Sequence, residues 1–491
     1  MLNVFHLYRP FCLGEKDDEE SRLVGGNEGW DRGRWWYNLA HVCQRWRKVI
    51  LGSASYLDLS LVCTRGTPVA DMLAHSPPLP LIIDFFEGPG DLAAEDEEGT
   101  IFALKQRDRI YRVRFSLTLQ TNVQKFIATM EEEYPMLECL VAMPSIIPGD
   151  IQIAVLPETL QAPHLRHLVL AGFDIPIGCR LLTDAVGLVT LYLYMDRPST
   201  YFHPNTLLQW LSFMPQLETI AIKFYLAVPS RDVETQLTHM SIIAPVTLPN
   251  LRYFEFRGVS TYLEALIYRI TSPRLEKLRI AFFHQLTFPV PRLLQFMNTT
   301  ENLRFNATKV EFSWWRVHVE VYSRGEVEMH DLHLTVRSRH LDWQVSSMAQ
   351  ISHSLSQMFS AVEDLTLEHT VHNLSSEEHN EVDRTEWHKL FSSFSRVKTL
   401  RIANGLVDQL SRCLQVDDGE IPLELLPELQ ELTYYGGDNT EDAFTSFIEA
   451  RQIADHPMTV VRRNPSQPAF VHFMASPIPP TSNEAENDID T

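Results

Sequence analysis

The chain has 491 residues, of which 45% are apolar and 21% charged, so it can form a large core or several stacked units. Its 42 Lys and Arg against 63 Asp and Glu give a formal charge of -21. This balance argues against nucleic acid as the main partner, because phosphate binding needs a basic surface, and leaves only a local basic patch open. With no signal-peptide pattern and no apolar stretch of roughly 18 residues, we expect an intracellular protein, cytoplasmic or nuclear, without a membrane partner.

More than half of the excess negative charge lies in three runs, at 15–20, 95–98 and 475–491. Such runs are typical of solvated loops and tails that keep a protein soluble. The six cysteines form no Cys-x-x-Cys pair, which favours free and mostly buried thiols in a reducing compartment.

The first predicted element is an amphipathic helix over 35–50, which follows an acidic and Gly-rich insertion at 14–34. Its expected apolar face consists of Leu39, Val42, Cys43, Trp46 and either Val49 or Ile50.

The run Val42-Cys43-Gln44-Arg45-Trp46 resembles the second half of an F-box, and residues 1–8 resemble the end of its first helix. Over residues 36–85 the chain is similar to F-box-like proteins of mushroom-forming (basidiomycete) fungi, in which leucine-rich repeats follow. The Leu-Pro-x-Glu that opens a typical F-box does not occur at the start of this sequence. The resemblance implies a helical module over 1–54 that binds a Skp1-like adaptor. It assigns the module's core and adaptor contact to Leu2, Phe5, Leu39, Val42, Cys43 and Trp46.

A repeat of the form Pro-x-Leu-x-x-Leu-x-Leu, with conservative replacements, dominates the rest of the chain. The first apolar positions of its nine copies are 137, 165, 188, 217, 251, 275, 362, 397 and 429. Each copy alternates apolar and polar residues, as a strand with one buried face does. Earlier strand-like runs at 57–61, 79–83 and 113–117 are expected to begin the array.

Helical patterns separate the copies, with Ser260 as a candidate N-cap of one of them. Their apolar stripes are Val123, Phe126, Ile127, Met130 and Tyr134; Leu263, Leu266, Ile267 and Ile270; and Trp387, Leu390, Phe391 and Phe394. A single strand and helix cannot bury their apolar faces alone, so neighbouring units must stack. The sequence therefore predicts an α/β fold, a leucine-rich-repeat-type solenoid with a curved parallel sheet and outer helices, over 55–454.

The region 308–341 departs from this repeat, because three strand patterns follow one another before a helical pattern at 343–359. We interpret it as a hairpin inserted into the solenoid near 315–336. Residues 455–491 are expected to be an extension that leads into a disordered acidic tail.

Within each repeat the residues between the apolar positions should face the exposed side of the sheet. These predicted outward residues are basic and aromatic in the middle strands, a composition that favours protein interfaces. The candidate target-binding residues are Tyr192, Tyr194, Lys223, Tyr253, Arg257, Lys277 and Arg279. An ordinary solvated strand face is an equal alternative. A target bound here is expected to be acidic or phosphorylated.

The sequence contains no metalloprotease, nucleophile-elbow, phosphate-loop or dinucleotide motif, so no catalytic residue, metal or cofactor is predicted. His369 and His372 beside Glu368 read as a loop rather than a metal site. We expect a non-enzymatic protein, a substrate-recognition subunit of an SCF-type ubiquitin ligase. The alternative is a free-standing repeat scaffold whose F-box-like remnant only caps the solenoid.

Overall fold

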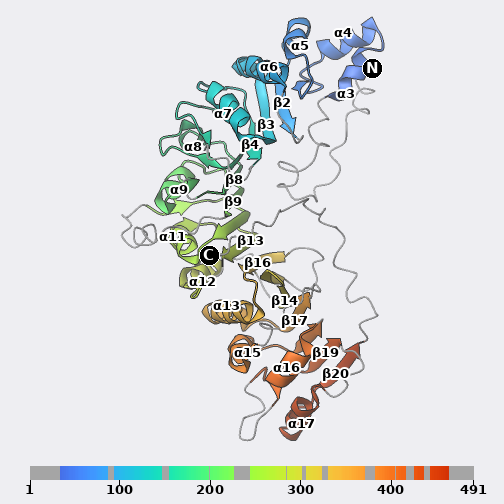
Figure 1. Cartoon of the computed structure of the whole chain (residues 1–491), viewed down its shortest axis with the longest axis vertical. Coiled ribbons are helices and arrows are strands. Elements are labelled where there is room, and N and C mark those ends of the chain that lie inside the picture. Colours follow the sequence, from blue (N-terminus) through green and yellow to red (C-terminus); the bar gives the residue numbers. More distant parts are fainter. Residues whose placement is uncertain are drawn as a thin grey trace. The chain divides into compact units, whose positions relative to one another are not determined.

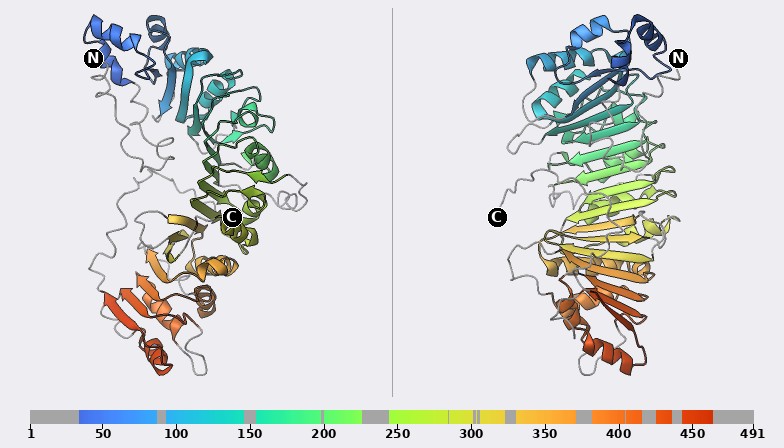
Figure 2. Two further views of the ribbon diagram at one scale, coloured as in Figure 1. Left: turned by 180° about the vertical axis from the view of Figure 1, so that it is seen from behind. Right: turned by 90° about the vertical axis from the view of Figure 1, so that its right-hand side faces the viewer.

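The computed structural model describes residues 34–86, 93–145, 154–197, 200–225, 244–283, 285–300, 303, 306–322, 330–370, 382–403, 405–415, 425–435 and 443–463. The chain divides into two compact units, 1–285 with 289–303 and 286–288 with 304–491. In both units helices alternate with strands along the chain and line one face of a mostly parallel sheet (Figures 1 and 2). The protein is thus an α/β protein, consistent with a leucine-rich-repeat-like solenoid.

Every strand pair given for the main sheet of the first unit is parallel, in the order β1-β2-β3-β4-β6-β8-β9-β11-β13. These strands are β1 (Leu61–Cys63), β2 (Leu81–Phe86), β3 (Ile110–Leu119), β4 (Cys139–Ser145), β6 (His167–Ala171), β8 (Thr190–Met195), β9 (Thr219–Phe224), β11 (Tyr253–Gly258) and β13 (Lys277–Phe283). Two small parallel sheets pair β5 (Ala154–Val155) with β7 (Phe173–Asp174) and β10 (Val246–Thr247) with β12 (Ile270–Thr271).

The helices of this unit connect successive strands, as parallel pairing requires, except for α3 and α4, which precede β1, and α12, which follows β13. They are α3 (Trp35–Ala40), α4 (Gln44–Gly52), α5 (Val69–His75), α6 (Ala94–Leu104), α7 (Gln120–Thr129), α8 (Arg180–Thr183), α9 (Pro204–Leu211), α11 (Ser260–Ile267) and α12 (Pro291–Asn298), with a 3₁₀ turn at Arg107–Arg109.

The second apolar position of each repeat forms a continuous ladder through the core. The paired residues, each at most 1% exposed, are Leu140, Leu168, Leu191, Ile220, Phe254 and Leu278. A fully buried side chain of this size contributes about 1.5–3 kcal/mol through apolar burial, so each repeat adds to the stability of the fold. The sequence period and the observed register agree here.

In the second unit the sheet order is β16-β15-β14-β17-β18-β19-β20. Its elements are β14 (Ala307–Ser313), β15 (Arg316–Tyr322), β16 (His330–Arg337), α13 (Leu341–Ser354), α14 (Ser356–Phe359), β17 (Asp364–Thr370), α15 (Arg384–Phe391), β18 (Thr399–Ala403), α16 (Val407–Leu414), β19 (Glu431–Tyr435), α17 (Thr445–Ile453) and β20 (Thr459–Arg463). β14 pairs antiparallel with β15 and parallel with β17, while β15 and β16 form an antiparallel pair. The antiparallel strands lie where the sequence placed an inserted hairpin, and the sheet extends past residue 454 through β20.

The expected single helix over 35–50 is wrong, because a turn at residues 41–43 separates α3 from α4. Cys43 adopts an extended backbone (φ -161°, ψ 166°), and its Sγ accepts the amide N–H of Trp46 at 3.4 Å. The residue predicted within one helix is therefore the N-cap of the next helix.

The structure differs from the sequence-based predictions at three further places. The 95–98 run is not a loop but lies in α6, with three acids in the first turn, where the helix dipole favours negative charge. Ser260 is the first residue of α11 and Val259 occupies the cap position. The first strand begins at Leu61 rather than at residue 57.

None of the described helices is long and apolar enough to span a membrane. The predicted acidic tail and the 14–33 part of the insertion lie outside the described residues.

Candidate binding face of the first unit

The sheet of the first unit has two chemically different faces. Phe126 of α7 packs on Phe115 of β3 with ring centroids 5.0 Å apart, and Phe296 of α12 packs on Phe254 of β11 at 6.2 Å. Because side chains alternate along a strand, neighbours of these residues such as Arg114 and Glu255 point to the other side. We call the side turned away from α7, α11 and α12 the distal face.

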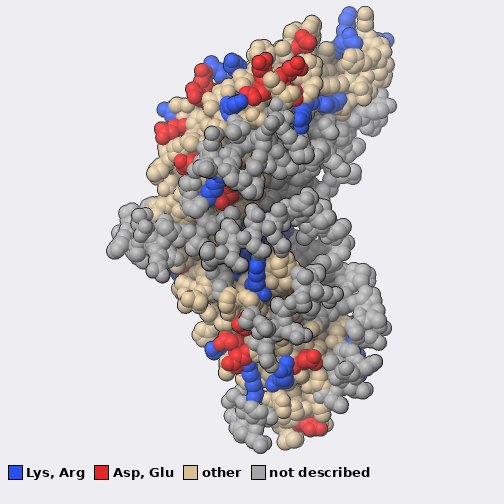
Figure 3. Space-filling view, viewed as in Figure 1, with Lys and Arg blue, Asp and Glu red and all other residues tan. Residues whose placement is uncertain are grey.

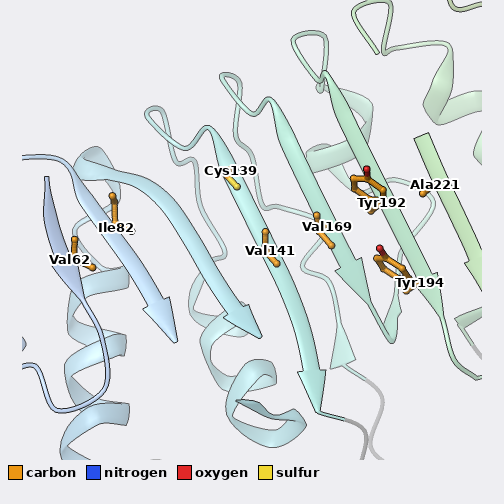
Figure 4. Packing of buried hydrophobic residues seen from close by; sticks show 8 residues of the cluster. All are labelled: Val62, Ile82, Cys139, Val141, Val169, Tyr192, Tyr194 and Ala221. Atoms are coloured by element: carbon orange, nitrogen blue, oxygen red, sulfur yellow. The ribbon is translucent and has the colours of Figure 1, made fainter. Parts of the chain in front are cut away.

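From β1 to β9 the distal face carries a buried apolar cluster (Figure 4), which Asp84 of β2 and Arg114 of β3 interrupt. Its buried cluster consists of Val62, Ile82, Cys139, Val141, Val169, Tyr192, Tyr194 and Ala221. Burial raises the pKa of the Cys63 and Cys139 thiols to about 12, so neither thiol is a nucleophile near neutral pH.

From β8 to β13 the same face becomes aromatic and basic, and the strand register arranges its side chains in cross-strand rows. One row contains Tyr192, Ala221, Glu255 and Arg279; the next contains Tyr194, Lys223, Arg257 and Ala281; a third contains Thr219, Tyr253 and Lys277. The register therefore brings all seven predicted target-binding residues onto one face.

Contacts within these rows fix the side chains. The Lys223 amine lies 3.0 Å from a Glu255 carboxylate oxygen and 5.2 Å from the Tyr194 ring centroid. The Tyr253 hydroxyl donates to Glu255 at 2.9 Å. The Arg279 guanidinium lies over the Tyr253 ring at 5.5 Å. Cation–π contacts and the ion pair thus hold the positive charges in place.

The expectation that all seven side chains lie on an exposed surface is wrong for three of them. Tyr192 is 2% exposed, Tyr194 6% and Lys223 7%. Alternation predicts the side to which a residue points, but the exposure of that side depends on tertiary packing. Tyr253, Arg257, Lys277 and Arg279 are half-buried, so these four form the accessible part of the candidate face.

A buried ion pair on the distal face was not predicted. Arg114 Nε donates to one Asp84 oxygen at 2.7 Å, and its Nη2 donates to the other at 2.9 Å. The Arg114 side chain is fully buried. The polar residues at these positions are visible in the sequence, but only the β2–β3 register pairs them.

At the N-terminal module, Leu39 and Trp46 are half-buried while Val42 and Cys43 are exposed. Val42 is 59% exposed and lies in the turn between α3 and α4. Leu2 and Phe5 lie outside the described residues. Over the N-terminal part of the first unit, acidic and basic side chains are interspersed on the surface seen in Figure 3.

A second polar cluster lies on the hairpin of the second unit. His318, Glu320 and His333 bring possible metal-ligand atoms within 4.8 Å of one another. The alternation His-x-Glu on β15 was the available sequence signal, but His333 joins it only through the hairpin register. Near it, Glu368 and His369 lie in β17 rather than in a loop, and His372 falls outside the described residues.

No model of a known protein family matches the chain, and no curated protein matches it in sequence. The class that the fold defines is an α/β protein with helices alternating along a mostly parallel sheet.

Proposed function

We propose that this protein is a non-enzymatic target-recognition subunit of an SCF-type ubiquitin ligase, built on a leucine-rich-repeat-type solenoid. In this proposal the N-terminal helices bind a Skp1-like adaptor and the distal face of the first unit binds the target. The observation that carries the recognition role is the in-register group of basic and aromatic residues on β9, β11 and β13.

The target-binding role rests on charge and on residue type. Arg257, Lys277 and Arg279 are the basic residues on the accessible part of the face, and Glu255, its one acid, is paired with the buried Lys223, in a chain of net charge -21. Arginine and tyrosine are favoured interface residues, because they provide large contact areas together with hydrogen bonds. An acidic or phosphorylated protein segment is the complementary partner.

The adaptor-binding role rests on the exposed apolar side chains between α3 and α4. Val42 and Cys43 are exposed and Trp46 is half-buried, so together they offer an apolar surface that a partner protein would cover. The same residues carry the F-box resemblance.

A free-standing scaffold remains the second candidate, and contacts of α3 favour it. Trp36 Nε1 donates to the carbonyl of Ser60 at 3.1 Å, and the Val62 amide donates to the Tyr37 hydroxyl at 3.2 Å. These contacts let α3 cover the first strand, as a terminal cap of a repeat array does.

Co-purification of the full chain with a Skp1-type adaptor separates the two candidates. If the protein is an adaptor-binding subunit, we expect Val42→Asp to abolish association, because the new carboxylate would be buried in an apolar contact without solvent. Val186→Asp is the matched control, since Val186 is 60% exposed and lies in the loop between α8 and β8. Absence of association by the folded wild-type chain would favour the scaffold, whereas equal association by both variants would place the adaptor contact on another surface.

A further inference from the structure

The inserted hairpin of the second unit places three metal-ligand side chains on one side of its sheet. His318 and Glu320 are two residues apart on β15 and so point the same way. On β16, His333 pairs with Glu320 and Thr335 pairs with His318. All three potential ligands are half-buried.

We propose that His318, Glu320 and His333 form a binding site for a divalent transition metal ion, with Zn²⁺ as the preferred probe. Two imidazoles and one carboxylate suit zinc, whereas calcium and magnesium favour sites made of oxygen atoms. The three ligands leave a fourth tetrahedral position for water or for a group of a bound partner.

The distances between the ligand atoms fit this coordination. Bonds of about 2.0–2.1 Å in a tetrahedral zinc site place neighbouring ligand atoms about 3.3 Å apart. His318 Nε2 lies 3.1 Å from Glu320 Oε1 and 3.4 Å from His333 Nδ1. Only small side-chain rotations are needed to bring the Glu320 and His333 atoms to the same separation, because all three already lie within 4.8 Å.

The second ring nitrogen of His318 has a partner that can orient the ligand. Nδ1 lies 2.8 Å from the Thr335 hydroxyl oxygen. When Nδ1–H donates to this oxygen, the lone pair is left on Nε2 and points toward the metal position, as in zinc sites whose histidines carry an outer hydrogen bond. The competing arrangement is a plain hydrogen-bond network, in which Thr335 donates to Nδ1 and Nε2–H donates to Glu320.

Charged side chains of both signs surround the cluster. On the adjacent strands, Lys309 lies 3.7 Å from Glu311 and 3.0 Å from Glu368. On the hairpin itself, Arg316 and Arg337 pair with each other, two residues from His318 and Thr335. The ligand types and the distances between their atoms, and not an excess of local charge, therefore carry the proposal.

Zinc binding by the full chain tests the proposal. After chelator treatment and dialysis, Zn²⁺ is titrated calorimetrically into wild type, His318→Gln, His333→Gln and the control His353→Gln. His353 is an exposed histidine in α13 of the same unit, outside the cluster. We expect wild type and the control to bind one more Zn²⁺ per chain than the two cluster variants. Equal stoichiometry and affinity in all four proteins would overturn the proposal.

A second variant keeps the test decisive if a histidine variant fails to fold. Thr335→Val preserves the ligands and the strand but removes the hydrogen-bond partner of His318. We expect its zinc affinity to fall on the order of 10–100-fold. Co²⁺ replaces Zn²⁺ as an optical probe, and the visible absorption of a four-coordinate ion should be present in wild type. An unchanged zinc affinity in Thr335→Val, together with only the spectrum of hydrated Co²⁺ in wild type, would show that the cluster is a hydrogen-bond network.

Discussion

The Asp84–Arg114 pair is the residue-scale feature on which the distal face depends. Because the guanidinium is fully buried, it needs the carboxylate to compensate the loss of water. We expect Asp84→Ala to lower the free energy of unfolding by about 3–5 kcal/mol, since one buried charge loses its partner. Urea unfolding of wild type and variant measures the difference.

The matched control for this prediction is Glu97→Ala. Glu97 also forms an ion pair within the first unit, with Lys125 at 2.8 Å, but that lysine is exposed. An exposed pair contributes about 0–1 kcal/mol, so the control should remain close to wild type. A similar small effect in both variants would mean that the Arg114 charge is solvated.

Sequence reasoning at this scale predicts the direction of a side chain better than its exposure. Alternation correctly places Tyr192 and Lys223 on the side opposite the core ladder, because the strand period is fixed by backbone geometry. It does not predict that both are buried, since burial depends on segments distant in sequence. The Asp84–Arg114 and His318–His333 contacts could not be predicted either, because each joins residues on two different strands that only the sheet register brings together.

At the scale of elements, Glu264 of α11 caps the neighbouring helix α12. Its two carboxylate oxygens accept the amide N–H groups of Arg292 and Leu293, both at 2.9 Å. A helix N-terminus leaves such amides without intrahelical partners. We expect Glu264→Ala to reduce the free energy of unfolding by about 1–3 kcal/mol, because buried donors lose their acceptor. Chemical unfolding tests this, with the surface variant Glu276→Ala as the control expected to change stability by less than about 1 kcal/mol.

The same carboxyl group gives the stability a defined pH dependence. Burial raises the pKa of Glu264, against the lowering effect of the two amides and of Arg292. The folded protein therefore holds this proton more tightly than the unfolded chain, and stability decreases as the pH rises from the ordinary glutamate range through the raised pKa. Glu264→Gln cannot titrate, so its stability should lack this decrease. Parallel slopes for the two proteins between about pH 4 and pH 7 would contradict the assignment.

Element boundaries were predictable where the pattern is long and periodic. The three buried stripes occur in and next to α7, α11 and α15, and the antiparallel strands follow the alternation in 308–336. The break at 41–43 was not predictable from hydrophobicity, because the apolar spacing continues across it. An extended backbone at Cys43 decides the break, and hydrophobic spacing carries no information on it.

For the whole molecule, the repeat makes the architecture readable from sequence, while the charge distribution suggests how the molecule selects a partner. Because the chain as a whole carries a charge of -21, it repels an acidic target at long range, and the basic group attracts such a target only within about a Debye length, roughly 8–10 Å. This effect acts on the association rate and weakens as salt increases.

The basic side chains on the accessible part of the distal face provide a direct test of this charge distribution. We expect Lys277→Glu with Arg279→Glu to abolish capture of acidic or phosphorylated proteins from cell extract, because both side chains lie on the accessible part of the distal face. Lys105→Glu with Arg180→Glu is the control, since it makes the same charge change at exposed positions in or next to α6 and α8. Quantitative mass spectrometry of captured proteins at two salt concentrations compares both with wild type. Proteins of the predicted class should be lost only from the first variant and should bind wild type less at high salt. Equal capture by the two variants, or capture that does not depend on salt, would place target binding on another surface.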